Sequence, residues 1–380
     1  MHILIAPNAF KNSLDATKVA EAINNGLRKS KLSCTTTCFP VADGGDGTAG
    51  LLIDHLDGQL IHTIVNDPLK RKITSSFGWI EKDKTAIIEL ATASGFRLLK
   101  AGEYDPLITT TQGTGELIIE ALNKDVAKII LCIGGSATVD GGTGILNALG
   151  IKFFNAEGNE LDDLPASLSS LAEIDIKGLD KRIVNTEIII LCDVENPLLG
   201  PNGAAAVFGP QKGASGKDVE LLEAGLTKFR DVVLNKTGKD MAVIKHGGAA
   251  GGVAASLHTF LNARLVNGID YFLEATGFEN ELKKTDIVIT GEGCIDEQTF
   301  QGKGPFGVAK RAKEFSLPVI AFAGRVAIAS DQSSQQYFDR LISINENNND
   351  LQEAIKNTYT NLEKAAQQLG DLLFLSHVQN

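Results

Sequence analysis

The chain has 380 residues, a length typical of two domains, each large enough to bury a core without disulfides or a structural metal. Hydrophobic residues make up 43% of it and charged residues 22%, which excludes an intrinsically disordered chain. The 47 acidic and 36 basic residues give a net charge of −11, so we expect neither a nucleic acid nor an anionic membrane as a partner.

The cysteines and the N-terminus bear on the compartment. The five cysteines are odd in number and form no Cys-x-x-Cys pair, which indicates reduced thiols rather than a disulfide framework or a zinc ribbon. The N-terminus has no basic segment before its short apolar run, and no stretch of 18 consecutive apolar residues occurs. We therefore expect a cytoplasmic protein.

The chain opens with a βαβα pattern. Residues 3–6 predict a strand, and apolar residues at helical spacing over 14–27 predict a helix with Ser13 or Asp15 as its N-cap. A second strand and a second helix are predicted at residues 37–41 and 51–56. Such alternation is typical of a parallel sheet.

The middle of the chain has a different pattern. Three predicted strands are joined by short polar turns, which favours an antiparallel meander; they span residues 61–65, 73–79 and 86–90. A helix and two buried strands are predicted after them, at residues 115–122, 128–133 and 186–192.

The alternating pattern returns near the C-terminus. Strands are predicted at residues 286–290, 318–322 and 341–344, with helices at 306–315 and 351–369. We therefore expect an α/β protein in which both chain ends, residues 1–57 and 284–380, form a discontinuous parallel-sheet domain. Residues 58–283 would form an inserted second α/β domain, and the ligand site would lie between the two, where glycine-rich loops can meet.

Glycine is clustered along the chain. Of 39 glycines, 22 fall in five clusters, at residues 44–47, 134–144, 200–216, 247–252 and 291–307. Clustered glycine indicates backbone folded closely around a ligand. In the second cluster, Ser136, Thr138 and Asp140 follow a buried strand, which makes them candidate binding residues.

Lysines and carboxylates accompany other loops. Lys11 and Ser13 follow the first predicted strand, where open α/β sheets bind ligands. Asp193 follows another strand and could accept a proton from a substrate hydroxyl, while Lys212 among glycines could neutralise phosphate. A capping aspartate and a surface lysine are the structural alternatives.

The last glycine cluster contains a candidate magnesium site. Glu292 and Asp296 are four residues apart, and Mg²⁺ binds one or two carboxylates together with phosphate oxygens and water. Lys303 lies just before a predicted helix and could meet the same phosphates. A solvated pair of carboxylates is the structural alternative.

Two other functions remain open from the residues. Residues 45–50 match G-x-G-x-x-G, the fingerprint of an NAD-dependent dehydrogenase, although Asp43 and Asp46 would repel a pyrophosphate there. A non-catalytic binding protein for small anions would need the glycine loops and the lysines alone. A Walker A motif is absent, because Gly304 follows Lys303 where Ser or Thr is required.

The chain resembles the bacterial class I glycerate kinases over nearly its whole length. The matching segments are PVADGGDGT (40–48), ELATASG (89–95), TQGTGELI (111–118), IGGSATVDGGTG (133–144), CDVENPLLG (192–200), VFGPQKGA (207–214), HGGAAGG (246–252) and VITGEGCIDEQTFQGKGPFGVA (288–309). The first loop departs from the family pattern: Asn8, Ala9 and Asn12 replace an acid, a hydroxyl and a glycine. Cys294 stands where a basic or polar residue is more usual.

The resemblance implies a flavodoxin-like, Rossmann-like domain interrupted by a second, mixed α/β domain. It also implies transfer of the γ-phosphate of ATP to D-glycerate, usually at the 2-hydroxyl, with Mg²⁺ as the metal. The residues themselves leave open which hydroxyl is phosphorylated and the oligomeric state, with a homodimer as one option.

We assign roles to the candidate residues as hypotheses. Asp193 is the expected base, and Lys11, Lys212 and Lys303 are expected to bind phosphate or carboxylate, with Lys11 taking a catalytic part. Glu292 and Asp296 are expected on the magnesium side. The other expected binding residues are Ser13, Asp43, Ser136 and Asp140; Asp43, Asp46 or Asp140 could exchange roles with Asp193.

Overall fold

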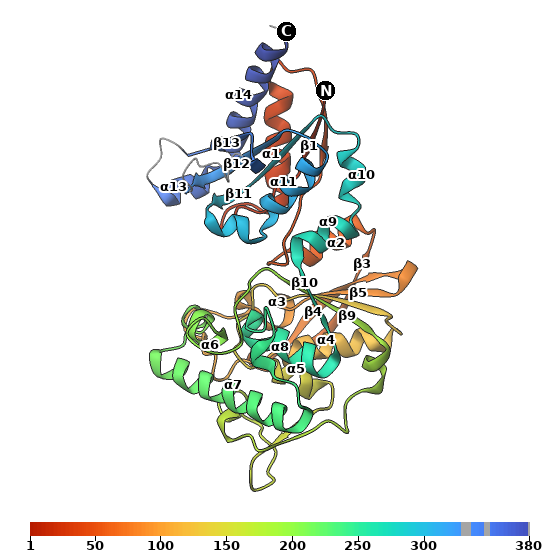
Figure 1. The fold of residues 1–380 in the computed structure, drawn as a ribbon, viewed down its shortest axis with the longest axis vertical. Helices are drawn as coiled ribbons and strands as arrows, with labels where there is room; N and C mark the ends of the chain where they lie inside the picture. The colour runs from red at the N-terminus through yellow and green to blue at the C-terminus, as the bar shows by residue number, and fades with distance from the viewer. Residues whose placement is uncertain (328–335, 346–349, 379–380) are drawn as a thin grey trace. The chain divides into compact units, whose positions relative to one another are not determined.

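The computed structural model describes residues 1–327, 336–345 and 350–378 (Figure 1). It divides into two compact units. The terminal unit consists of Met1–Asp43 and Asn267–Asn380, and the central unit is Gly44–Val266. The expected fold class is confirmed: both chain ends build one α/β unit, and a mixed α/β unit is inserted between them.

The terminal unit contains a five-stranded parallel sheet. Its strands are β1 (His2–Ile5), β2 (Thr35–Cys38), β11 (Ile287–Ile295), β12 (Val319–Val326) and β13 (Arg340–Ser343). They lie in the order β13-β12-β11-β1-β2, and each neighbouring pair is parallel. With the strands numbered along this unit, the order is 2-1-3-4-5, that of flavodoxin-like folds.

Side-chain alternation explains how this sheet is covered. Ile3, Ile289 and Phe322 belong to one buried cluster with the apolar faces of α1 (Ala16–Lys29) and α14 (Thr358–Val378), which lie side by side. Helix α1 begins at Asp15, whose carboxylate accepts a hydrogen bond from the Lys18 backbone N–H at 2.8 Å. The N-cap is therefore Asp15 rather than Ser13.

The other helices of the terminal unit are shorter. They are α9 (Gly268–Ala275), α10 (Phe278–Leu282), α11 (Gly304–Glu314) and α13 (Leu351–Lys356). Helix α11 packs on β11 and β12 and also contacts α9. Pro305 stands in its first turn, where the missing N–H costs no helical hydrogen bond.

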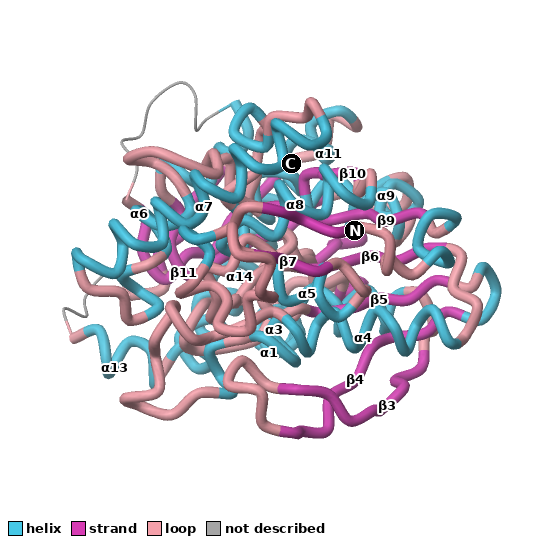
Figure 2. Tube along the Cα trace, turned by 90° about the horizontal axis from the view of Figure 1, so that it is seen from below, coloured by secondary structure: helices cyan, strands magenta, loops and turns pink. Residues whose placement is uncertain are grey.

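The central unit contains a six-stranded mixed sheet. Its strands are β3 (Gln59–Asn66), β4 (Lys72–Ile80), β5 (Thr85–Glu89), β6 (Lys128–Cys132), β9 (Glu187–Cys192) and β10 (Arg264–Asn267). Figure 2 shows β9, β6, β5, β4 and β3 following one another across it, in the order β10-β9-β6-β5-β4-β3. The predicted meander is confirmed, since β3–β4 and β4–β5 are antiparallel, whereas β5–β6 and β6–β9 are parallel. A separate hairpin pairs β7 (Lys152–Phe154) with β8 (Glu173–Asp175).

Helices cover both faces of the central sheet. Ile88, Leu131 and Ile190 belong to a large buried cluster with residues of α4 (Gln112–Asn123), α5 (Thr143–Ala148), α7 (Gly216–Thr237) and α8 (Ala249–Leu261). The alternate residues Ile87, Ile130 and Ile189 are also buried, on the opposite face. Helix α2 (Thr48–His55) packs against β4 and β5. Two short helices, α3 (Ala91–Ser94) and α6 (Ala204–Phe208), complete the unit.

The unit boundaries differ from those expected at 57/58 and 283/284. Helix α2 belongs to the central unit because it packs against β4 and β5, so the first crossing falls after Asp43. Helices α9 and α10 belong to the terminal unit, and α9 packs against α11. None of the helices in the described ranges is long and apolar enough to span a membrane.

The contact between α1 and α14 generates a stability prediction. A Cβ added at Gly26 of α1 would clash with the Glu363 carbonyl oxygen and lie 2.6 Å from the Ala366 Cβ. Relief of the clash would require a shift of the α14 backbone, which costs more than the rotation of a flexible side chain. We expect Gly26→Ala to lower the free energy of unfolding by about 1–3 kcal/mol. Urea-induced unfolding followed by circular dichroism measures it.

Gly50→Ala is the matched control. Gly50 is exposed in helix α2, and a Cβ there would meet nothing within 4 Å. Alanine should raise the free energy of unfolding by about 0.5–1 kcal/mol through helix propensity alone. Equal effects of the two substitutions would contradict the packing argument.

Candidate active site

The glycine loops of the central unit pack against one another. A Cβ at Gly134, just after β6, would lie 2.6 Å from the Gly45 Cα, and one at Gly251 would press on the Thr138 carbonyl oxygen. Only glycine permits such close backbone contact at these positions. The 44–47, 134–144 and 247–252 clusters therefore form one loop assembly beside the carboxyl end of β6.

Lys212 is buried against this assembly. Its side chain comes from a short 3-10 turn (Pro210–Lys212) after α6, and the residue is only 2% exposed. Its Nζ lies 2.7 Å from the Ser136 Oγ and 2.6 Å from the Thr138 carbonyl oxygen. Burial lowers the pKa of the Lys212 ammonium to about 7, and the nearby charge of Asp140 opposes this only in part. The structure thus brings together two sequence-predicted residues, Ser136 and Lys212.

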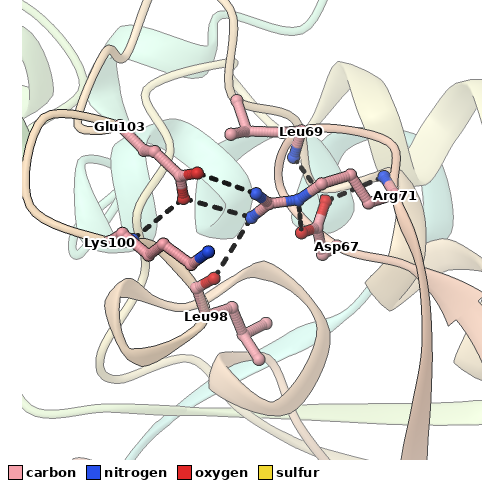
Figure 3. A network of polar contacts seen from close by, with 6 residues as sticks. All are labelled: Asp67, Leu69, Arg71, Leu98, Lys100 and Glu103. Atoms are coloured by element: carbon pink, nitrogen blue, oxygen red, sulfur yellow. Dashed lines mark hydrogen bonds and ion pairs between the residues drawn. The ribbon is translucent and has the colours of Figure 1, made fainter.

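A polar network fixes the loop that packs beside Lys212. Arg71 donates hydrogen bonds to Asp67, to Glu103 at 2.9 Å and to the Leu98 carbonyl oxygen at 3.2 Å (Figure 3). This network joins the β3–β4 turn to residues 98–103. Tyr104 follows directly, and its carbonyl oxygen packs so closely on Gly213 that a Cβ there would clash. The network therefore holds the segment that precedes Tyr104, and Tyr104 packs against Gly213, the residue after Lys212.

Asp140 is wholly buried and its oxygens are engaged within the central unit. They accept hydrogen bonds from the Thr111 backbone N–H at 2.8 Å and its hydroxyl at 2.7 Å, and from the backbone N–H groups of Gly142 and Gly144. Burial raises the pKa of the Asp140 carboxyl although these hydrogen bonds oppose the rise. The geometry gives Asp140 a scaffold role, joining the N-terminal ends of α4 and α5; substrate binding by Asp140 stays a prediction.

Glu89 is a buried carboxylate beside the glycine loops that was not among the residues predicted from the sequence. It ends β5, and its two oxygens accept hydrogen bonds from the backbone N–H groups of Gly47 at 2.8 Å and Ala49 at 3.1 Å. Burial, together with the neighbouring Asp46, raises the pKa of Glu89 to about 7. Asp46 forms an ion pair with Arg97 at 2.6 Å. A carboxylate of the chain itself therefore occupies the N-terminal end of α2 in the G-x-G-x-x-G segment.

Asp193 lies half-buried directly after β9, which neighbours β6 in the sheet. Parallel pairing of β6 and β9 brings their carboxyl ends to the same sheet edge, so Asp193 and the loop of Ser136 start from adjacent strands. The following residue, Val194, is fixed by a 2.7 Å hydrogen bond between its carbonyl oxygen and the His246 Nδ1.

In the terminal unit, Asn8 and Asp43 form the first of two polar groups. Asn8 Nδ2 donates to Asp43 Oδ2 at 2.8 Å, and the Gly304 backbone N–H at the start of α11 donates to the same oxygen at 3.3 Å. The Asn8 backbone N–H donates to the Gly291 carbonyl oxygen at 2.8 Å. The residue that replaces the family's acid is thus a hydrogen-bond donor to Asp43.

The second polar group contains the predicted magnesium residues. The Thr299 hydroxyl donates to Glu292 Oε1 at 2.7 Å, the Thr299 backbone N–H donates to Asp296 Oδ1 at 3.2 Å, and Lys303 Nζ lies 3.6 Å from that Asp296 oxygen. Glu292 is 7% exposed, and burial raises its pKa to about 7; the charges of Asp43 and Asp296 add to the rise. The structure brings Glu292, Asp296 and Lys303 together, with Thr299 as an unpredicted member.

These residues fit a magnesium ion in their chemistry. The negative charges of Asp43 and Asp296 help to raise the pKa of Glu292, and a hard cation bound beside Glu292 would offset this repulsion. In the described ranges, no three His, Cys, Asp or Glu side chains are already arranged to hold a metal. Phosphate oxygens and water would have to supply the remaining ligands.

Lys11 and Ser13 lie in the loop after β1. Lys11 is exposed, whereas the Ser13 hydroxyl donates to the Ile355 carbonyl oxygen of α13 at 2.8 Å. The structure thus gives Ser13 a bond between two segments of the fold, and its expected ligand contact stays a prediction. Asn12 has φ +65°, a left-handed conformation that suits the glycine usual in the family.

The two residues that were not predicted, Glu89 and Thr299, each stand out in the sequence in a different way. Glu89 is the polar end of an otherwise apolar strand, and Thr299 lies between two candidate ligands and the glycines of a predicted loop. A carboxylate at the carboxyl end of a buried strand lies at the ligand-binding edge of a parallel sheet, as does one inside the glycine loop that follows such a strand.

Comparisons with known proteins agree over the whole chain. Residues 3–374 match the model of the glycerate kinase family. A glycerate kinase from Bacillus subtilis (strain 168) is 43% identical over 369 residues, covering 97% of each chain. A glycerate 2-kinase from Escherichia coli (strain K12) is 42% identical over 373 residues, covering 98% of each chain.

A solved structure agrees as well. The crystal structure of a glycerate kinase 2 candidate from Salmonella typhimurium LT2 superposes with a TM-score of 0.84 and 40% sequence identity, covering 99% of each chain. The structural similarity, the sequence similarity and the family match therefore all extend over nearly the whole chain. The chain belongs to the glycerate kinase family and is a kinase.

Proposed function

We propose that this kinase transfers the γ-phosphoryl group of ATP to D-glycerate and releases ADP and 2-phosphoglycerate. The observation that carries the proposal is the end-to-end similarity to a glycerate 2-kinase from Escherichia coli. Phosphoryl transfer depends mainly on positioning and on neutralising charge. Lys212 is held by Ser136 in the central unit, and Lys303 lies beside Asp296 in the terminal unit.

Each cluster receives a role in this reaction. Lys303, next to the N-terminal end of α11, and Lys11, in the loop after β1, would bind phosphate oxygens. Glu292 and Asp296 would hold Mg²⁺, which when bound neutralises charge on the nucleotide phosphates. In the central unit, Ser136 and Lys212 would serve the acceptor. Asp193 remains the residue that the sequence predicts as the base.

The structure supports this reading over dinucleotide chemistry. In an NAD site the glycine-rich turn leaves backbone N–H groups free for a pyrophosphate. Here the N–H groups of Gly47 and Ala49 already donate to Glu89. A pyrophosphate would have to displace a buried carboxylate of the chain itself. The cytoplasmic location and a homodimer stay predictions.

The first experiment measures ADP release from purified protein with ATP, D-glycerate and Mg²⁺, followed by separation of 2- and 3-phosphoglycerate. We expect 2-phosphoglycerate as the product and loss of turnover with EDTA. Turnover that yields only 3-phosphoglycerate would contradict the assignment of the 2-hydroxyl as the acceptor. A folded protein with no turnover would contradict the proposed function as a whole.

Ligand protection separates the kinase from the dehydrogenase. We expect MgATP to raise the melting temperature of the protein, because a ligand bound to the native state at 100 times its Kd stabilises it by about 2.7 kcal/mol. NAD at the same concentration should leave the melting temperature unchanged. Differential scanning fluorimetry gives the answer, and protection by NAD alone would favour a dehydrogenase.

Glu292→Gln tests the magnesium side. The amide keeps the shape and can still accept from the Thr299 hydroxyl, but it carries no charge for a cation. We expect about a 10- to 100-fold rise in the Mg²⁺ concentration needed for half-maximal turnover. Titration of activity with Mg²⁺ at fixed ATP and D-glycerate measures it.

Glu297→Gln is the control for this substitution. Glu297 is exposed, lies five residues further along the chain and undergoes the same chemical change. It should keep the Mg²⁺ dependence of the wild type. If the two variants behave alike, the magnesium assignment to Glu292 is wrong.

A further inference from the structure

The surroundings of Lys212 are unusual for a buried ammonium. Buried lysines are normally paired with a carboxylate, because an isolated buried charge is costly. The hydrogen bonds of Lys212 instead run to the Ser136 hydroxyl and the Thr138 carbonyl oxygen, both uncharged. The Phe208 ring, 6.0 Å from the Nζ, adds an apolar neighbour.

The charged group that faces Lys212 does not neutralise it by contact. Asp140 acts on the amine through its field, but its oxygens are engaged by Thr111, Gly142 and Gly144. Desolvation therefore prevails and favours the neutral amine, which keeps the pKa of Lys212 at about 7. A neutral amine has a lone pair with which to accept a proton.

We propose that Lys212 is the proton acceptor of the reaction and acts through the hydroxyl of Ser136. This inference rests on the proposed kinase function and competes with Asp193 for the role of base. The 2.7 Å separation of the Lys212 Nζ and the Ser136 Oγ allows a proton to pass between them. The closely packed glycine loop holds Ser136 in place for this transfer.

The chemical step balances as follows. The acceptor hydroxyl oxygen of D-glycerate forms a bond to the γ-phosphorus of ATP, and the bond from that phosphorus to the β,γ-bridging oxygen breaks, leaving the electron pair on ADP. The hydroxyl proton passes to the Ser136 Oγ while the proton of Ser136 passes to the Lys212 Nζ. The ammonium then returns this proton to water before the next turnover.

Substitution of Lys212 distinguishes a role as proton acceptor from a role in binding phosphate through its positive charge. Arginine keeps the positive charge but cannot lose its proton in a protein, whereas methionine removes the charge. A proton acceptor requires that both Lys212→Arg and Lys212→Met lower kcat by about 10²–10⁴-fold across pH 6–9. A Lys212→Arg enzyme within tenfold of the wild type would overturn the proposal. Lys228→Met, on the exposed face of α7, is the control expected to keep wild-type kcat.

Ser136 and Asp193 variants supply the second comparison. Ser136→Ala should lower kcat by about 10²-fold or more, and Ser136→Thr, which restores a hydroxyl, should recover a large part of it. Asp193→Asn should retain more kcat than Lys212→Met. A greater loss in Asp193→Asn than in Lys212→Met would return the role of base to Asp193.

A measurement independent of activity tests the state of the amine. In protein labelled with ¹³C at lysine Cε, the Lys212 signal is assigned by its absence from Lys212→Met and followed over pH 5–10. We expect a midpoint near 7 in the folded enzyme, and a midpoint above 9 would overturn the proposal even if the Lys212→Arg variant failed to fold. Wild-type enzyme without turnover on D-glycerate would refute the proposed function instead, whatever the Lys212 midpoint.

Discussion

Close backbone packing among glycine loops is the constraint on which the central unit depends. Gly134 touches the Gly45 backbone, and Gly251 touches the carbonyl of Thr138. Because these positions exclude a side chain, the loop after β6 is compressed into a small volume at the carboxyl end of its strand. Ser136 and Thr138 come to lie within hydrogen-bond distance of the Lys212 Nζ as a result.

Burial of polar groups shifts their ionisation in both units. Burial lowers the pKa of Lys212 to about 7 and raises that of Glu89 to about 7 within the central unit. In the terminal unit, burial raises the pKa of Glu292 to about 7 as well. Each shift means that the buried surroundings of the group disfavour its charged form. Such groups gather at functional sites more often than elsewhere, since they can change charge near neutral pH. The fold thus accepts a loss of stability where proton and charge transfer would occur.

Patterns in the sequence were sufficient for the fold class, but they predicted no element between residues 193 and 285, where α7 and α8 lie. Short polar turns between three predicted strands favoured the meander of β3, β4 and β5, and the return of the βαβ pattern predicted a sheet shared by both chain ends. The boundaries were harder, because an amphipathic helix such as α2 shows that one face is buried but not which sheet buries it. The boundary therefore fell on the wrong side of α2.

Side-chain roles were the least accessible to the sequence. A glycine-flanked Asp140 suggests a ligand residue, yet its oxygens accept hydrogen bonds from Thr111, which precedes it by 29 residues. Ser13 suggests a cap or an anion ligand, yet its hydroxyl donates to Ile355, 342 residues away. Only the tertiary structure brings such partners together, so one sequence without the fold could not separate scaffold from site.

The G-x-G-x-x-G segment shows how one local pattern can support different chemistry. Its geometry, a glycine turn before a helix, presents N–H groups that favour an anion. In this chain Glu89 supplies the anion from the end of β5, so the turn serves to hold α2 against the sheet. What decides between a cofactor loop and a structural one is thus the presence of an internal carboxylate, contributed here by a residue 42 positions further along the chain.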